Sequence, residues 1–530
     1  MQVSEFAFNY GLNAGFFDYN PPKAEVWVKE APLIAERLET VNHGIVAPTS
    51  AGKTVMALLS IVINPRRTLF LVPLRRLTNR HQALFVALCD TWQTRCITGE
   101  TKESDRIWDD TDDKIVFATA HVVVSELMSN PWLLTHFDLI VFDEMHNASS
   151  TESVYAQVAT LADQLQIRRL ALSASPGNTK SQIQSVQANC KLDELVRITI
   201  PTPDPIVRVV WAEEAGCYHS GQQNEVEHFV HGQQMRLSEK FANLAVHLPL
   251  GKEYKLEPDK FRTRQAAAKL RQELYGLSDS PVKFMMMGVF EEFMAWTHIY
   301  SLITEESFLA VQGYVDKTLA KKTAKYAKRL REDFRLKQLL NWLPQLIHPK
   351  IEVLLQLMQW LTTRNKQAII FVGNKETAKE CYQYLTAVGL ACDVMFGSGQ
   401  MKHEEQEAVL ERMETGEIQS IIATTVLREG FNLSVDVIIN MALPSSAIDL
   451  IQRSGRAGRH CHPAEIIYVA TKLERLKLIG LRKKVEKLSL LDLSALSSPP
   501  AAKPVKKRKT KGRFSSKWQP NLFELDSQIQ

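Results

Sequence analysis

The feature that most constrains this chain is a strand, a glycine-lysine-threonine loop and a helix in direct succession. The apolar run Gly44–Ala47 leads into the loop APTSAGKT, and the apolar stretch Val55–Leu59 that follows indicates a helix. In such a loop the backbone N–H groups at the helix start face phosphate oxygens. The candidate nucleotide-binding residues are Ala47, Pro48, Thr49, Ser50, Ala51, Gly52, Lys53 and Thr54. Ala47 replaces the first glycine of the usual pattern, so the loop needs a second motif to support it.

That second motif is a pair of adjacent carboxylates at the end of a strand. The buried-type run Leu139–Phe142 ends in Asp143 and Glu144. One carboxylate suits a metal ion and the other suits polarising the water that attacks a phosphate, while Lys53 and Thr54 suit phosphate and Mg²⁺. The two motifs together predict a motor driven by a nucleoside triphosphate.

Short β-rich runs alternate with helix-like stretches in two separate parts of the chain, which predicts two parallel sheets covered by helices. The expected strands are Gly44–Ala47, Thr68–Val72, Lys114–Ala118, Asp138–Phe142 and Arg169–Leu172, then Gln367–Val372, Asp393–Phe396, Ser420–Thr424, Val437–Met441 and Glu465–Val469. Between them, from about 216 to 343, strand signals disappear and several long helices are expected. A chain of 530 residues is also too long for a single core.

Further motifs follow in a recognisable order. They are Leu71–Arg75, Thr98-Gly99, Ala118–Ala120, Leu172–Gly177, Ala423–Thr425, Glu429–Leu433 and the run QRSGRAGR from Gln452 to Arg459. This order resembles the superfamily 2 DExH helicases over residues 45 to 460, and the final run is its most specific part. The Ser-Ala-Ser-Pro-Gly motif and the helical insertion are similar to those of the Hef/FANCM and RIG-I-like group, with some Ski2-type features.

The resemblance implies an α/β fold of two RecA-like domains with a helical insertion between them. We expect an N-terminal segment (1–41), a first motor domain (42–212), the insertion (213–345), a second motor domain (346–490) and a disordered basic tail (491–530).

The resemblance also implies roles at an ATP and Mg²⁺ site. Lys53 would neutralise charge on the β- and γ-phosphates, Thr54 and Asp143 would hold Mg²⁺, and Glu144 would orient the attacking water. The second domain would contribute Gln452, the arginine fingers Arg456 and Arg459, and Glu429 and Gly430 in the cleft.

Other positions match family residues that touch nucleic acid or couple it to hydrolysis. The nucleic-acid set is Arg75, Thr98, Gly99, Thr119 and Thr424, and the coupling set is His146, Ser173 and Ser175. Contacts to the backbone carry no sequence information, so these residues predict no sequence specificity. An ordinary solvated role is the alternative for Arg75.

Eight cations crowd what reads as one helix between Lys317 and Arg335. Lys321, Lys325 and Lys328 are therefore candidates for contact with nucleic-acid phosphates. A solvated helix face is the alternative.

No glutamine occurs between Val3 and Arg80, where many relatives place an adenine-reading Gln. An aromatic side chain, Phe17, Tyr19 or Trp27, is the expected substitute. ATP is the implied nucleotide, with GTP or mixed use left open.

Composition limits the remaining classes. The net charge of +5 is mild, so a nucleic-acid surface must come from local clustering. The seven cysteines include no C-x-x-C pair and the N-terminus resembles no secretory signal, which favours an intracellular protein. Depending on the cell, we expect a cytoplasmic or nucleoid location, or a nuclear one. The apolar segment Phe284–Thr304 carries charges and is expected to be a core helix, without a membrane span.

The basic tail contains Gln519-Pro520-Asn521-Leu522-Phe523, which resembles the Q-x-x-L-F peptide that binds bacterial sliding clamps. The basic run before it could instead be a nuclear address, a DNA-binding arm or a spacer. Three functions stay open: a DNA helicase or translocase in repair, recombination or genome defence, an RNA helicase or remodeller, and a nucleotide-gated nucleic-acid sensor that does not unwind.

Overall fold

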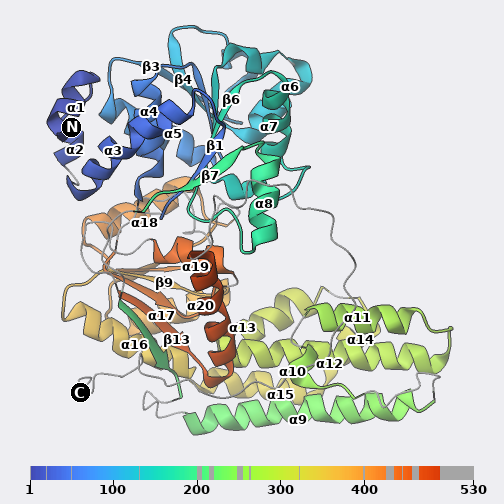
Figure 1. Ribbon diagram of the computed structural model, residues 1–530. Coiled ribbons are helices and arrows are strands. Elements are labelled where there is room, and N and C mark those ends of the chain that lie inside the picture. Colours follow the sequence, from blue (N-terminus) through green and yellow to red (C-terminus); the bar gives the residue numbers. More distant parts are fainter. Residues whose placement is uncertain are drawn as a thin grey trace, which may run out of the picture.

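A computed structural model describes residues 2–18, 21–48, 51–130, 132–199, 206–213, 220–247, 255–261, 264–321, 323–397, 400–424, 435–444, 446–455 and 465–489. It contains two α/β domains, one above the other in Figure 1, and a layer of helices beside the second domain. The predicted α/β class with two RecA-like sheets is confirmed.

The first sheet has seven parallel strands in the order β3-β4-β2-β5-β6-β1-β7. These strands are β1 (His43–Val46), β2 (Thr68–Val72), β3 (Gln93–Ile97), β4 (Asp113–Thr119), β5 (Leu139–Phe142), β6 (Arg168–Ser173) and β7 (Glu194–Arg197). Along β2, Phe70 and Val72 join one hydrophobic cluster while Leu69 and Leu71 join the other. Helices therefore cover both faces, as the continuous apolar strands require. The covering helices are α4 (Lys53–Ile63), α5 (Arg75–Leu88), α6 (Ala120–Ser129), α7 (Val154–Gln164) and α8 (Lys180–Asn189).

The N-terminal helices belong to the core of the first domain. They are α1 (Val3–Asn9), α2 (Gly15–Asp18) and α3 (Pro21–Arg37). Their side chains Phe6, Phe17 and Trp27 share a buried cluster with Met56 and Leu59 of α4. The expected separate segment 1–41 is thus part of the first domain, because α3 covers α4.

The second sheet has six parallel strands in the order β10-β11-β9-β12-β13-β8. Its strands are β8 (Ile206–Trp211), β9 (Ala368–Phe371), β10 (Cys392–Met395), β11 (Ser420–Ala423), β12 (Val437–Asn440) and β13 (Glu465–Ala470). The expected end of the first domain at residue 212 is wrong, because β8 pairs with β13 of the second sheet. This strand lies at the sheet edge with partly exposed side chains, so its sequence carries a weak signal.

Helices complete the described part of the second domain. They are α16 (Pro349–Thr362), α17 (Lys375–Ala387), α18 (His403–Glu414), α19 (Ala447–Ser454) and α20 (Arg475–Ser489). Val485 of α20 packs against the first-domain cluster of Leu71 and Phe142 and also against the cluster that contains Leu450 of α19. The end of α20 therefore contacts both motor domains.

The insertion is helical, as expected. Its helices are α9 (Ser220–Ala245), α10 (Pro258–Phe261), α11 (Arg264–Tyr275), α12 (Pro281–Glu305), α13 (Phe308–Gly313), α14 (Lys325–Glu332) and α15 (Phe334–Trp342). The core helix expected over Phe284–Thr304 is α12, which buries Phe290, Phe293 and Trp296. Within the described part of the chain, no helix combines the length and apolar character that a membrane span needs.

The sequence suggested that the basic segment 317–335 forms one helix, and this prediction is wrong. It is divided among the π-helical turn Tyr314–Leu319, α14 and α15, and Asp333 caps α15 by accepting a hydrogen bond from Arg335 N–H at 2.9 Å. Helix propensity is high throughout, but the break lets Ala327 and Leu330 of α14 turn into the insertion core.

A buried polar cluster joins the insertion to the second domain. The Lys350 ammonium lies 2.8 Å from the Glu474 carboxylate and donates to the carbonyl of Glu305 at 2.7 Å. His348 Nε2 is 2.8 Å from the carbonyl of Ile303. Burial raises the pKa of the neighbouring Glu306 to about 7, although the Lys350 charge opposes the shift. The end of α12 is therefore fixed to the second domain by polar contacts that are shielded from water.

Candidate nucleotide site and nucleic-acid edge

Strand register places the first-domain candidate residues along one edge of the first sheet. Val46 is level with Ser173, Val72 is level with Thr119, and Leu71 is level with Phe142. Because all strands are parallel, the segments that follow them emerge together at the carboxyl edge. Across this edge the order is Thr98 and Gly99 after β3, Thr119 at the end of β4, Arg75 after β2, Asp143 to His146 after β5, Ser173 and Ser175 at β6, and the P-loop after β1. The nucleic-acid candidates occupy one half of the edge and the nucleotide candidates the other.

The P-loop is held in shape by backbone conformation and by one tryptophan. Gly52 has φ of 77°, in the left-handed region that favours glycine, and it caps α4. Lys53 begins α4, and its ammonium donates to the carbonyls of Ala47 at 3.2 Å and Pro48 at 3.3 Å. Trp27 Nε1–H donates to the carbonyl of Ala51 at 2.8 Å. The lysine is thus directed into the loop, and α3 supports the loop from behind.

The structure does not support Phe17 or Trp27 as adenine contacts. Phe17 is 1% exposed, and its ring packs against Phe6. Trp27 is 7% exposed and lies against Gly52, because a Cβ added there would be 2.5 Å from the indole nitrogen. Tyr19 lies outside the described residues.

Asp143 and Glu144 form a strained, well-supported turn after β5. Glu144 has φ of 53°, a left-handed conformation that is uncommon for a residue with a side chain. The hydroxyl of Tyr155 donates to the Asp143 carbonyl at 2.7 Å, and His81 Nε2 lies 2.9 Å from Asp143 Oδ2. Burial lowers the pKa of Arg80, and the Asp143 charge partly opposes that shift. Contacts from α5 and α7 therefore hold Asp143 in place at this turn.

The coupling candidates are in contact with one another. His146 Nδ1 lies 3.4 Å from Glu144 Oε2 and 3.5 Å from Ser173 Oγ. The Ser173 hydroxyl accepts a hydrogen bond from Ser175 N–H at 3.1 Å, and Ser175 Oγ donates to the Gly177 carbonyl at 3.3 Å. A polar chain therefore runs from the carboxylate pair to the loop after β6.

The nucleic-acid candidates lie in loops whose polar groups partly contact one another. Arg75 pairs with the Glu100 carboxylate, and both side chains are more than half exposed. Thr98 Oγ1 accepts from Glu100 N–H at 3.2 Å, and Thr119 precedes α6 as its N-terminal cap residue. Thr424 directly follows β11 at the corresponding edge of the second sheet.

The loop after β6 also touches the second domain. Ile448 N–H of α19 donates to Asn178 Oδ1 at 3.1 Å. The same helix carries the buried Gln452 and Arg453, and Arg453 pairs with Asp449 at 3.0 Å. Other predicted positions lie outside the described residues, namely Thr49, Ser50, Glu429, Gly430, Arg456, Arg459 and the tail peptide Gln519–Phe523.

Sequence reasoning missed His81 and Tyr155, and it assigned Trp27 a different role. His81 and Trp27 come from helices on one face of the sheet, where His81 packs against Phe70, whereas Tyr155 comes from α7 on the opposite face. Their sequence positions look like ordinary helix residues, so only the packing of α3, α5 and α7 identifies them.

The donors at this edge suit Mg²⁺. Thr54 offers a hydroxyl at the start of α4, and Asp143 offers a carboxylate after β5. These are the hard oxygen ligands that Mg²⁺ prefers, and the ion usually takes its remaining ligands from phosphates and water. The described residues contain no group of three or more histidine, cysteine, aspartate or glutamate side chains arranged for a metal.

Two RecA-like sheets with a P-loop and an Asp-Glu turn on one edge define a P-loop nucleotide hydrolase. Comparison with known proteins agrees: residues 31–183 match the DEAD/DEAH box helicase family and residues 349–461 match the helicase conserved C-terminal domain. The chain belongs to the superfamily 2 helicases and resembles the Hef/FANCM group.

Individual relatives can be aligned with most of this chain. ATP-dependent DNA helicase mph1 of Aspergillus terreus is 25% identical over 88% of this chain and 47% of its own length. DEAD-box ATP-dependent RNA helicase FANCM of Arabidopsis thaliana is 23% identical over 86% of this chain and 36% of its own length. The crystal structure of the Pyrococcus furiosus Hef helicase domain has a TM-score of 0.59 and 22% identity, covering 86% of this chain and 97% of that one. The chain therefore spans about half or less of these two curated relatives, and the likeness to Hef concerns the fold.

Proposed function

We propose that this chain couples ATP hydrolysis to unwinding of, or movement along, a nucleic acid, and that the substrate is DNA in repair, recombination or genome defence. The observation that carries this proposal is the shared sheet edge, where His146 connects the carboxylate turn at Glu144 to Ser173. Similarity to a protein named as a DNA helicase over 88% of the chain favours DNA.

In the proposed reaction, a water molecule attacks the γ-phosphate of ATP, the bond from the γ-phosphorus to the bridging oxygen breaks, and ADP leaves as phosphate forms. Lys53 neutralises phosphate charge, and Glu144 orients the water and accepts its proton. Thr54 and Asp143 would hold Mg²⁺, which stabilises the charge that develops on the phosphate oxygens. Because the charge grows in the transition state, cations contributed by the second domain would accelerate hydrolysis. We assign that role to Arg456 and Arg459, with Gln452, Glu429 and Gly430 lining the cleft.

The proposed nucleic-acid path follows the half of the first sheet's carboxyl edge that does not hold the nucleotide candidates. Arg75, Thr98, Gly99 and Thr119 would contact the backbone from the first domain, and Thr424 would do so from the second. Within the insertion, Lys321, Lys325 and Lys328 are exposed and would add contacts to phosphates. Such contacts position the strand without reading its sequence.

Replacing Glu144 with Gln tests the hydrolytic site. We expect Glu144→Gln to lose ATP hydrolysis by about 10³-fold, or about 4 kcal/mol of barrier, while fluorescent ATP still binds. The matched control is Glu152→Gln, because Glu152 is an exposed glutamate on the following loop. Turnover like that of the unchanged protein in Glu144→Gln would refute the assignment.

One alternative has specific support, and the sensor alternative stays open. An RNA substrate is favoured by the Arabidopsis relative that is named as an RNA helicase. Measuring ATPase stimulation by single- and double-stranded DNA and RNA separates the substrates. A strand-displacement assay then separates a helicase from a sensor that only closes on its ligand. Binding of a synthetic Gln519–Phe523 peptide to a bacterial sliding clamp tests the proposed tail contact.

A further inference from the structure

The carboxylate of Asp143 has a buried partner on a neighbouring helix. His81 lies on α5, is 5% exposed, and places Nε2 at 2.9 Å from Asp143 Oδ2. The other carboxylate oxygen, Oδ1, accepts a hydrogen bond from Glu144 N–H at 3.1 Å. Each oxygen therefore has one partner, and each keeps lone-pair capacity for another. These two contacts fix the plane of the carboxylate.

The surroundings of the His81 ring fix its hydrogen-bonding role. The ring packs edge-on against Phe70 at a centroid distance of 5.5 Å and against Phe117 at 6.5 Å. Within the described part of the chain, Nδ1 is buried and has no hydrogen-bond partner. A carboxylate oxygen can only accept, so Nε2 must carry the hydrogen that makes the observed contact. An apolar pocket thus directs one N–H group at Asp143.

We propose that His81 is a positioning residue that orients Asp143 for the magnesium ion of the nucleotide complex. The inference rests on the proposed function, because it needs Mg²⁺-nucleotide to bind at this edge. A hydrogen bond to a ligating carboxylate removes its rotational freedom before the ion arrives. Loss of such an outer partner commonly costs 10- to 100-fold in metal affinity.

A purely structural histidine would behave differently. It would contribute to folding through its contacts with Phe70 and Phe117, and its replacement would lower thermal stability without a specific effect on Mg²⁺. Two variants separate these roles. His81→Leu keeps an apolar side chain but removes the donor, and His81→Gln keeps an amide N–H close to the position of Nε2.

The experiment titrates Mg²⁺ into the full chain mixed with fluorescent ADP, so that no hydrolysis is needed. We expect His81→Leu to raise the half-saturating Mg²⁺ concentration about 10- to 100-fold and His81→Gln to restore it to within about threefold. Binding of the same ADP in the presence of EDTA should be unchanged in both variants. His43→Leu is the matched control, because His43 is also a buried histidine but lies at the start of β1, at the opposite edge of the sheet from Asp143.

Three outcomes would overturn the inference. The first is a normal Mg²⁺ titration in His81→Leu. The second is an equal loss in the Leu and Gln variants, accompanied by a lower melting temperature. If the Leu variant does not fold, His81→Asn replaces it, because the asparagine amide is one methylene too short to reach Asp143. A normal Mg²⁺ titration in His81→Asn is the third outcome that would overturn the inference. If the unchanged protein shows no Mg²⁺-dependent ADP binding, the proposed function fails instead.

Discussion

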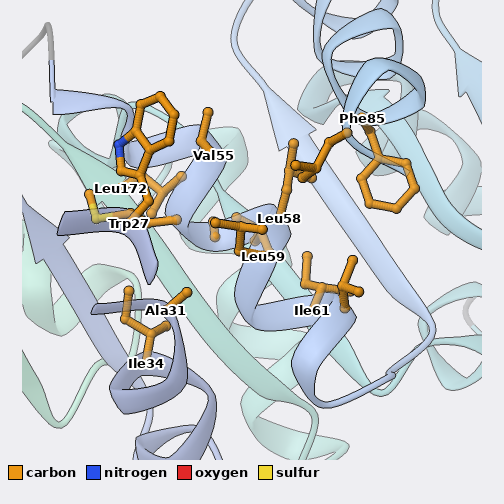
Figure 2. Close-up of a cluster of buried hydrophobic side chains, with 14 of the residues drawn as sticks. Trp27, Ala31, Ile34, Val55, Leu58, Leu59, Ile61, Phe85 and Leu172 are labelled. Atoms are coloured by element: carbon orange, nitrogen blue, oxygen red, sulfur yellow. The ribbon is translucent and has the colours of Figure 1, made fainter. Parts of the chain in front are cut away.

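Trp27 should control how well the P-loop holds ATP. Its indole N–H donates to the Ala51 carbonyl at 2.8 Å, and the ring lies against Gly52. Figure 2 shows the indole of α3 in the cluster that also contains Val55 of α4 and Leu172 of β6. The side chain is 7% exposed, so both its hydrogen bond and its apolar contacts form away from water. Removing it should therefore affect the loop and the domain core together.

The structure allows the two effects to be separated. Trp27→Phe keeps a ring but removes the N–H group, which leaves the Ala51 carbonyl without that donor and costs about 1 kcal/mol. If that cost falls on the loop conformation that binds nucleotide, the Kd for ATP rises about fivefold. Trp27→Ala also leaves a cavity among Val55 and Leu172, and buried Trp to Ala changes cost about 3–5 kcal/mol of unfolding free energy.

The assay combines fluorescent-ATP binding, steady-state ATPase kinetics and thermal denaturation. Trp27→Phe should raise KM with little change in kcat, and Trp27→Ala should also lower the melting temperature. Trp132→Ala is the matched control, because Trp132 is 69% exposed. The reasoning is refuted if Trp27→Ala retains both the melting temperature and the ATP affinity of the unchanged protein.

Two further predictions concern charge. Because the pKa of Glu306 is raised to about 7, the native state holds a proton that the unfolded chain releases near 4.5, so the free energy of unfolding should fall as pH rises between these values. Glu306→Gln should flatten that slope and be more stable than the unchanged protein at pH 8 in denaturant titrations, and an unaltered slope would contradict the assignment. Replacing Lys321, Lys325 and Lys328 by Gln should weaken nucleic-acid binding and reduce the salt slope of log K by about 0.9 per lost phosphate contact. Lys114→Gln is the control and should leave the slope unchanged, because Lys114 lies near the start of β4, at the edge of the first sheet opposite the proposed contacts. An unchanged slope in the triple variant would mean that the three insertion lysines are only solvated.

The parts of the fold that sequence predicted are those whose residues are apolar and buried on both faces. All ten expected strands are present, and nine of them are central strands, such as β2 and β9, which read as continuous apolar runs, whereas β10 lies at an edge. The strands β3, β7 and β8 were missed. Each lies at an edge of its sheet, where polar or exposed residues are tolerated and the apolar pattern weakens.

The residues of the candidate site also fall into those that the sequence predicted and those that it did not. The residues proposed to touch phosphate or metal lie in or beside loops with a fixed spacing, so Lys53, Asp143 and Glu144 could be proposed from local chemistry. The residues that hold these side chains in place could not be predicted from the sequence. His81 follows Arg80 and precedes Gln82, and nothing in that polar run distinguishes it from a solvated helix residue. Its role depends on how α5 packs against β2 and β4, which is a property of the tertiary structure.

The path of the chain also bears on how hydrolysis could produce movement. It leaves the first sheet after β7, adds β8 to the second sheet, and only then enters the insertion (Figure 1). Both ends of the insertion therefore begin from the second domain, and the Lys350–Glu474 pair fixes the end of α12 to it. A rotation of the second domain during hydrolysis would carry the insertion lysines with Thr424, while Arg75 and Thr119 would stay with the P-loop. The two proposed sets of backbone contacts thus belong to different domains, and their separation would change with each ATP hydrolysed, as movement along a strand requires.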